Sequence, residues 1–159
     1  MIMGVAGCGK SALALALALR MNWPMLEGDH FHSAENRERM RSGVPLTDAH
    51  REGWLHALAD EIRNRPGGVI VTCSALKRAY RDMLRGASPD LRFIFLDVTP
   101  EEALQRVSRR ASEHFFPPGL LQSQFDTLER PAGEVDVLRM DAALPLDTLT
   151  EQAAQWLTQ

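Results

Sequence analysis

The stretch GVAGCGKS, Gly4 to Ser11, constrains the fold of this chain more than any other part of the sequence. It matches the pattern G-x-x-x-x-G-K-[ST] and lies between a short apolar segment and the strong helix formers of SALALALAL. Glycines let such a loop turn successive backbone N–H groups inward, and the helix that follows adds the positive end of its dipole. Lys10 brings a compact positive charge, and Ser11 brings a hydroxyl suited to Mg²⁺. The motif therefore predicts a nucleotide-phosphate site between a strand and a helix, whereas a glycine-rich turn without function is the plain alternative.

Strand and helix signals alternate along the rest of the chain. Strands are expected at 1–5, 24–27, 69–73, 92–98 and 135–140. Helices are expected at 10–21, 33–41, 47–64 and 75–85, from 100 onward, up to about 128, and at the C-terminus. This alternation predicts an α/β fold whose five-stranded parallel sheet is covered by helices on both faces.

Composition excludes several classes of function. The chain has 159 residues, 45% of them hydrophobic and 25% charged, which suits one globular domain spanning 1–159. Its net charge of −3 argues against nucleic acid or an anionic membrane as the main partner, and SALALALAL is too short to span a bilayer. Two cysteines, Cys8 and Cys73, are too few for a disulfide framework, so a reducing cytoplasmic location is expected.

The stretch LEGDHFH follows the expected second strand and contains Asp29, His30 and His32. Ligand-facing residues of a doubly wound sheet lie at the carboxyl ends of its strands, so Asp29 should face the same crevice as the phosphates. A carboxylate there can accept a proton from a hydroxyl, orient it, or hold Mg²⁺ through water. A zinc site would need further ligands at suitable spacing, and the neighbouring sequence has none. The histidines are therefore expected to contact a polar substrate, or else to be ordinary loop residues.

One of the two lysines of the chain, Lys77, follows the expected third strand in CSALKRAYRDMLR. It stands four residues before Arg81, which would put both cations on one helix face above the crevice. Two cations near a helix N-terminus suit an anionic partner, although a solvated basic face is the alternative.

Arg106, Arg109 and Arg110 precede the turn-rich HFFPPG. Such arginines can close over a transferring phosphate with a lid, although a surface salt-bridge face explains them equally well.

Several segments together, in order, carry a resemblance to a known family. GVAGCGKS, LEGDHFH, SGVPLTDAHREGWL, CSALKRAYRDMLR and HFFPPGLLQSQFDTLERP resemble the bacterial gluconokinase family of P-loop carbohydrate kinases, over nearly the whole chain. The resemblance implies a P-loop NTPase fold of the nucleoside-monophosphate-kinase type, a three-layer sandwich with a helical lid at about 106–129. It implies ATP-dependent phosphorylation of D-gluconate to 6-phospho-D-gluconate, with Mg²⁺, by a homodimer. One departure is Cys8, at a loop position where serine is common.

The resemblance also implies a role for each residue that matches a family motif. Lys10, Asp29, Lys77 and Arg81 would be catalytic, and Ser11 would bind the metal. The expected substrate contacts are Asp29, His30, His32, Lys77, Arg81 and His114. The expected nucleotide contacts are Gly4, Val5, Ala6, Gly7, Cys8, Gly9, Lys10, Ser11, Arg106 and Arg110.

Two other functions remain open on the residues themselves. Another P-loop small-molecule kinase, such as shikimate kinase, would use the same loop and an aspartate after the second strand. A non-catalytic nucleotide-binding switch would bind nucleotide without consuming it in an acceptor-dependent way, leaving Asp29 and Lys77 without a task.

Overall fold

The computed structural model describes residues 1–109 and 117–159, and within them five strands form one parallel sheet. The strands are β1 (Ile2–Met3), β2 (Met25–Glu27), β3 (Ile70–Thr72), β4 (Phe93–Asp97) and β5 (Val137–Asp141). They lie in the order β2-β3-β1-β4-β5, with Ile2 opposite both Thr72 and Ile94. The short strand β1 is thus central, and the loop that follows it leaves the middle of the sheet, between β3 and β4.

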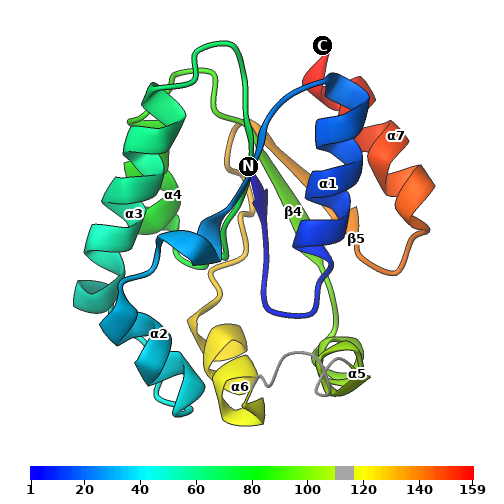
Figure 1. Cartoon of the computed structure of the whole chain (residues 1–159). Coiled ribbons are helices and arrows are strands. Elements are labelled where there is room, and N and C mark those ends of the chain that lie inside the picture. Colours follow the sequence, from blue (N-terminus) through cyan, green and yellow to red (C-terminus); the bar gives the residue numbers. More distant parts are fainter. Residues whose placement is uncertain (110–116) are drawn as a thin grey trace.

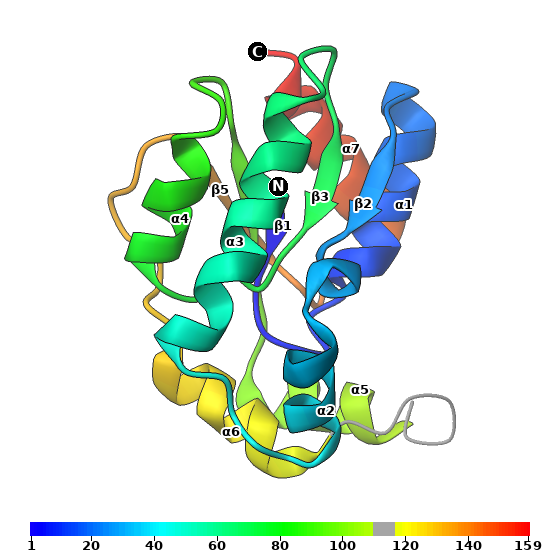
Figure 2. The ribbon, with the colours of Figure 1, turned by 60° about the vertical axis from the view of Figure 1, so that its left-hand side comes forward.

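Helices cover both faces of this sheet (Figures 1 and 2). Those of the described residues are α1 (Lys10–Met21), α2 (Ala34–Arg41), α3 (Asp48–Arg63), α4 (Arg78–Arg85), α5 (Pro100–Arg109), α6 (Pro118–Thr127) and α7 (Leu146–Leu157). Helices α1 and α7 pack on one face and α3 and α4 on the other, while α2, α5 and α6 gather beyond the carboxyl ends of the strands (Figure 1). None of the helices in the described part of the chain combines the length and the apolar character needed to cross a bilayer.

Two hydrophobic cores hold the layers together. Leu13 and Leu17 of α1 pack with Ala153 of α7 against one face of the sheet. Trp54 and Leu58 of α3 pack against the other face. Alternate residues of the central strands enter opposite cores, as the period of a β-strand requires. The inner strands β3 and β4 are buried on both faces, and every strand pair is parallel, which confirms the predicted parallel sheet.

The helix starts follow the capping signals of the sequence at three places. Ser33 and Thr47 cap α2 and α3, their hydroxyls accepting hydrogen bonds from the backbone N–H groups of Asn36 and His50. Before α5, the hydroxyl of Thr99 accepts from the N–H of Glu102, whose carboxylate accepts from Thr99 in return.

The start of α4 corrects a prediction. The helix begins at Arg78, whereas the sequence indicated Ala75. Ala75 has a left-handed backbone with φ of 43°, and Lys77 is extended at φ −99° and ψ 150°. Because Lys77 is the residue before the helix, it does not share a helix face with Arg81.

Candidate active site

The loop between β1 and α1, which we call the phosphate loop, has a conformation that depends on glycine. Gly4, Gly7 and Gly9 have φ of 139°, 79° and 103°. A Cβ on Gly7 would also lie 2.8 Å from the carbonyl oxygen of Ala103 in α5. Gly9 caps α1 without a side-chain hydrogen bond, so the N-terminal amides of this helix are left to an external acceptor. The loop and helix end together have the form of an anion site.

Lys10 and Ser11 occupy the first turn of α1. The Nζ of Lys10 donates to the carbonyl oxygens of Gly4 and Val5 at 3.1 and 3.0 Å, so its charge lies over the phosphate loop. The side chain is half-buried there, while Ser11 is exposed. A cation held by its own loop needs little rearrangement to meet an anion that enters the loop.

Two later elements contact the phosphate loop. The N–H of Ala6 donates to Oε1 of Gln124 in α6 at 2.7 Å. Arg106 of α5 donates to the carbonyl oxygen of Cys8 at 3.5 Å and to that of Ala142 at 2.8 Å. Arg106 thus contacts the phosphate loop, and its nucleotide contact stays a prediction. Gln124 was not predicted, because one polar residue in a helix of mixed composition gives no signal.

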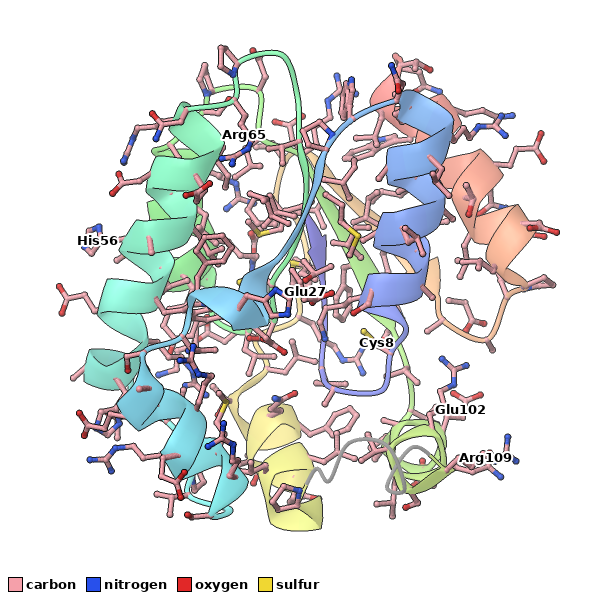
Figure 3. The ribbon with its side chains drawn as sticks, in the orientation of Figure 1. Cys8, Glu27, His56, Arg65, Glu102 and Arg109 are labelled. Atoms are coloured by element: carbon pink, nitrogen blue, oxygen red, sulfur yellow. The ribbon has the colours of Figure 1, made fainter. Side chains whose placement is uncertain are left out.

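Asp29 lies in the short 3-10 turn η1 (Gly28–Phe31), directly after β2. The N–H of Gly28 donates to the hydroxyl of Thr72 at 3.1 Å, and a Cβ on Gly28 would lie 2.0 Å from the carbonyl oxygen of Thr72. Only glycine lets the chain pass so close to β3. Asp29 and His30 follow directly and are exposed at the carboxyl end of the sheet. Glu27 and Cys8, labelled in Figure 3, lie at the same end, whereas Arg65 lies at the opposite end.

Unlike Asp29 and His30, His32 is buried. Its ring is 5% exposed and stacks on Trp54 with centroids 4.1 Å apart, while the indole N–H of Trp54 donates to the carbonyl of Gly28 at 2.7 Å. Burial lowers the pKa of His32 to about 4, against the opposing effect of the Asp29 carboxylate. His32 is therefore neutral at pH 7 and supports η1 through its stacking on Trp54.

Among the described residues, no group of three His, Cys, Asp or Glu side chains is placed to hold a metal ion.

Four side chains meet beside η1, two from the first turn of α3, one from the first turn of α4 and one from the residue before α4. We call them the α3–α4 cluster: Asp48, Arg51, Lys77 and Tyr80. The Nζ of Lys77 donates to both carboxylate oxygens of Asp48 at 2.8 Å, and the hydroxyl of Tyr80 donates to the same carboxylate. Arg51 donates to the hydroxyl of Tyr80 at 3.3 Å. The hydrogen bonds from Lys77 and Tyr80 lower the pKa of Asp48. The cluster thus contains two cations, Arg51 and Lys77, and one carboxylate, that of Asp48.

Of this cluster, the sequence predicted only Lys77 as a site residue. Asp48 and Arg51 stand in TDAHREGWL, at the start of a capped helix. The available signal was the capped start of the last helix before β3, because a helix that leads into a parallel strand begins at the carboxyl end of the sheet. Which side chains would meet there depends on the packing of α3 against α4, and the sequence pattern does not give it.

Arg81 does not lie with Lys77, which corrects the predicted substrate contact. Its side chain is 0% exposed. One guanidinium nitrogen donates to the carbonyl oxygens of Ala75 and Leu76 at 2.8 and 3.2 Å, and the other nitrogens pair with Glu134. A guanidinium so enclosed has no donor facing the crevice, so its role is structural.

Three further residues that the sequence singled out are Arg109, Arg110 and His114. Arg110 and His114 lie outside the described residues. Arg109 is exposed at the end of α5, where Figure 3 shows it pointing away from the phosphate loop.

The geometry brings three kinds of group to one end of the sheet. The phosphate loop with Lys10 offers an anion site, Asp29 an exposed carboxylate, and the α3–α4 cluster a pair of cations. This set can place a phosphoryl donor beside a hydroxyl-bearing anion, with a carboxylate between them to receive or orient a proton.

Known proteins that are similar to this chain are kinases, as this set of groups predicts. A family model described as shikimate kinase matches residues 6–124, so the chain belongs to that broad family of kinases. The gluconokinase of Gluconobacter oxydans is 41% identical over 95% of this chain and 86% of its own length. The thermoresistant gluconokinase of Escherichia coli is 43% identical over 92% and 85%. The chain is a member of the gluconokinase family.

Solved structures place the gluconokinase family within a wider fold. A gluconokinase from Sinorhizobium meliloti has a TM-score of 0.90 at 42% identity, covering 99% of this chain and 89% of that one. A shikimate kinase from Acinetobacter baumannii, solved with shikimate, has a TM-score of 0.63 at 18% identity, covering 99% and 90%. The second likeness shows the fold alone. The fold predicted from the sequence, that of a P-loop kinase of the nucleoside-monophosphate-kinase type, is confirmed.

Proposed function

We propose that this gluconokinase-family chain transfers the γ-phosphoryl group of ATP to the 6-hydroxyl of D-gluconate, giving 6-phospho-D-gluconate. The observation that carries the proposal is the convergence of the phosphate loop, Asp29 and Lys77 at one end of the sheet. Relatives about 40% identical over most of their length bear the name gluconokinase, which supports gluconate over shikimate as acceptor.

In this proposal the phosphate loop binds the nucleotide. Its amides and those at the N-terminus of α1 donate hydrogen bonds to the phosphate oxygens, and Lys10 neutralises the charge that shifts during transfer. Arg106 lies between the loop and Ala142, which suits contact with the nucleotide. Arg110 keeps the nucleotide role that the resemblance gives it.

The acceptor occupies the other half of the site. Asp29 accepts the proton of the 6-hydroxyl or orients it toward the phosphoryl group. His30, exposed beside it, hydrogen-bonds substrate hydroxyls, while His32 supports the turn beneath. Lys77 and Arg51 bind the gluconate carboxylate, which shares the cations with Asp48. His114 keeps the substrate role that the resemblance gives it.

The donor groups present fit a magnesium ion. Ser11 and Asp29 offer hydroxyl and carboxylate oxygens, which are the ligands Mg²⁺ prefers, and both side chains are exposed. When bound, the ion neutralises charge on the β- and γ-phosphates and orients them. Ser11 would hold it directly, and Asp29 is the residue suited to hold it through water.

The proposal also covers the organisation of the protein. The whole chain acts as one kinase domain, and the segment at about 106–129 acts as a lid over the nucleotide. The contact of Gln124 with the phosphate loop supports this, since it places α6 against the donor site. The cysteine content supports a cytoplasmic location. The family resemblance supports a homodimer, and light scattering of the purified protein tests this oligomeric state.

The deciding experiment is a coupled ADP-release assay with ATP and Mg²⁺. Gluconate should support turnover, whereas shikimate, adenylate and other sugar acids should not, and ³¹P NMR should identify a 6-phosphate ester. Lys10→Ala is the matched control and should lose phosphoryl transfer while keeping the wild-type circular dichroism spectrum. Turnover of shikimate in place of gluconate would assign the chain to the other kinase class. Nucleotide binding without acceptor-dependent turnover would make it a switch.

A further inference from the structure

The segment between β3 and α4 carries Lys77, and its backbone is in an unusual conformation. Ala75 has φ of 43°, a region that disfavours residues with a Cβ. Both Ala75 and Leu76 are 0% exposed. A conformation of this kind persists only where neighbouring groups hold it, so the question is which groups do so.

Arg81 holds this segment from within α4. One nitrogen of its guanidinium donates to the carbonyl oxygens of Ala75 and Leu76, the two residues directly before Lys77. The planar guanidinium presents its donors in a fixed direction, so these two bonds set the orientation of both peptide groups. Because Lys77 follows directly, these two hydrogen bonds also set the direction of its backbone.

Glu134 holds Arg81 in turn. Its side chain is 4% exposed, and its carboxylate accepts from Nε and the second terminal nitrogen of Arg81. Arg85 also donates to it at 2.8 Å. The hydrogen bonds from these arginines lower the pKa of Glu134 to about 2, so the carboxylate stays charged at neutral pH. Without it the charge of Arg81 would be buried and unpaired, which is unfavourable.

The partner of Arg81 comes from a distant part of the chain. Glu134 lies between α6 and β5, and Glu129 from the same stretch contacts the Lys77 segment directly. The N–H of Glu129 donates to the carbonyl of Leu76 at 2.8 Å, and its carboxylate accepts from the N–H of Arg78 at 2.7 Å. The stretch 129–134 is therefore bonded to the segment 75–78 on both sides of Lys77.

We propose that the buried Arg81–Glu134 pair is a positioning device for the acceptor substrate, which holds the Ala75–Leu76 backbone so that Lys77 meets the gluconate carboxylate. The inference rests on the proposed function, because it takes Lys77 as an acceptor ligand. Neither residue touches substrate. Arg81 acts through the two carbonyl oxygens, and Glu134 acts through Arg81.

The chain offers a matched control in Arg85. This residue also pairs with Glu134, and with Asp82 at 2.7 Å, but the hydrogen bonds of its guanidinium leave the Ala75 and Leu76 carbonyls untouched. Arg85→Gln removes an ion pair from the same carboxylate and leaves the hold on the Lys77 segment intact. Arg81→Lys keeps the charge but cannot bond both carbonyls and both carboxylate oxygens at once. Glu134→Gln is the second test variant, which keeps the shape of the partner.

Steady-state kinetics with gluconate and ATP separate positioning from plain stability. Arg81→Lys and Glu134→Gln should raise the KM for gluconate by about ten- to a hundredfold, as misplacement of a binding group does. Their KM for ATP should stay within about twofold of the wild type, because the phosphate loop is held by other contacts. Arg85→Gln should keep both KM values. Equal effects of Arg81→Lys and Arg85→Gln, or an unchanged KM for gluconate in Arg81→Lys, would overturn the proposal.

Hydrogen exchange supplies a measurement that does not depend on the substrate. Amides in a peptide covering 73–80 should exchange faster in Arg81→Lys and Glu134→Gln than in the wild type and Arg85→Gln. Wild-type protein that fails to phosphorylate gluconate would refute the proposed function, and this exchange pattern would still test whether the pair holds the segment. Unchanged exchange in Arg81→Lys would refute the holding role itself.

Discussion

At the scale of single residues, Asp29 and His32 have opposite environments, since Asp29 is exposed and His32 is buried. Asp29 is exposed at the carboxyl end of the sheet, the end from which the phosphate loop also leaves, and a carboxylate there can assist a hydroxyl. Asp29→Asn should preserve shape and nucleotide affinity but lower kcat by about a hundred- to ten-thousandfold, the usual contribution of a general base. Stopped-flow or coupled kinetics at saturating gluconate measure this. Asp90→Asn, in the exposed turn before β4, is the control and should keep full activity. Full activity of Asp29→Asn would remove it from the mechanism.

His32 makes a different prediction, about stability and pH. Its pKa is about 4 in the folded chain and 6.5 in its ordinary state, because burial against Trp54 disfavours the charged ring and Arg51 and Arg37 add to this. Between pH 6.5 and 4 the unfolded chain therefore binds a proton that the folded chain does not. The free energy of unfolding should fall as pH drops through this window, by at most about 1.4 kcal/mol per pH unit from this residue.

Urea unfolding at a series of pH values tests this effect. His32→Phe keeps a ring for stacking on Trp54 and removes the titration, so its stability should vary less with pH between 6.5 and 4. His56, exposed on the outer side of α3 in Figure 3, provides the control, since His56→Gln should keep the wild-type slope. Identical slopes in His32→Phe and wild type would show that this ring does not govern the acid sensitivity.

At the scale of elements, Gly28 and Gly53 separate two effects of replacing glycine by alanine. One is a steric clash with a neighbouring strand, and the other is a gain in helix propensity. Gly28 joins β2 to η1, and a Cβ there would lie 2.0 Å from the backbone of Thr72, which cannot move away. Gly53 lies inside α3, and nothing lies within 4 Å of the Cβ position. Gly28→Ala should therefore destabilise the protein by about 2 kcal/mol or more, while Gly53→Ala should stabilise it by about 0.5 to 1 kcal/mol.

Thermal and urea unfolding of the two variants check the signs. Gly28→Ala should also lower activity in the surviving folded protein, because the added methyl group would displace the backbone that carries Asp29. A stable, active Gly28→Ala variant would mean that β2 and β3 can separate at their carboxyl ends without cost to the site.

At the scale of the whole molecule, both substrates should stabilise the same folded state. In the proposed function, the groups that bind ATP come from the phosphate loop, α1 and α5, and those that bind gluconate come from η1, α3 and the segment before α4. A ligand that binds only the folded state at a hundred times its Kd adds about 2.7 kcal/mol. For a chain of this size that is a rise in Tm of about 5 to 10 °C.

Differential scanning fluorimetry measures this rise without turnover. A non-hydrolysable ATP analogue with gluconate should raise Tm more than the analogue alone, whereas the analogue with shikimate should equal the analogue alone. Lys10→Ala should lose most of the shift due to the nucleotide. A larger shift with shikimate than with gluconate would contradict the proposed acceptor.

Much of the fold and part of the site follow from the amino-acid sequence alone. The phosphate loop, its strand and helix, the parallel sheet and most helix starts depend on local signals: glycines, caps and apolar runs. Asp29 was located for the same reason, because a residue directly after a parallel strand must lie at the carboxyl end of the sheet.

Only the tertiary structure decided what each buried polar side chain contacts. Arg81 and Lys77 look equivalent in the sequence, yet Glu134, 53 residues further on, draws Arg81 inward while Lys77 meets Asp48. His32 looks like a ligand until Trp54 covers its ring. Such pairings join residues far apart in the chain, and their geometry depends on how the helices pack on the sheet. Local sequence patterns specify the elements and the position of their ends, but not which side chains those ends bring into contact.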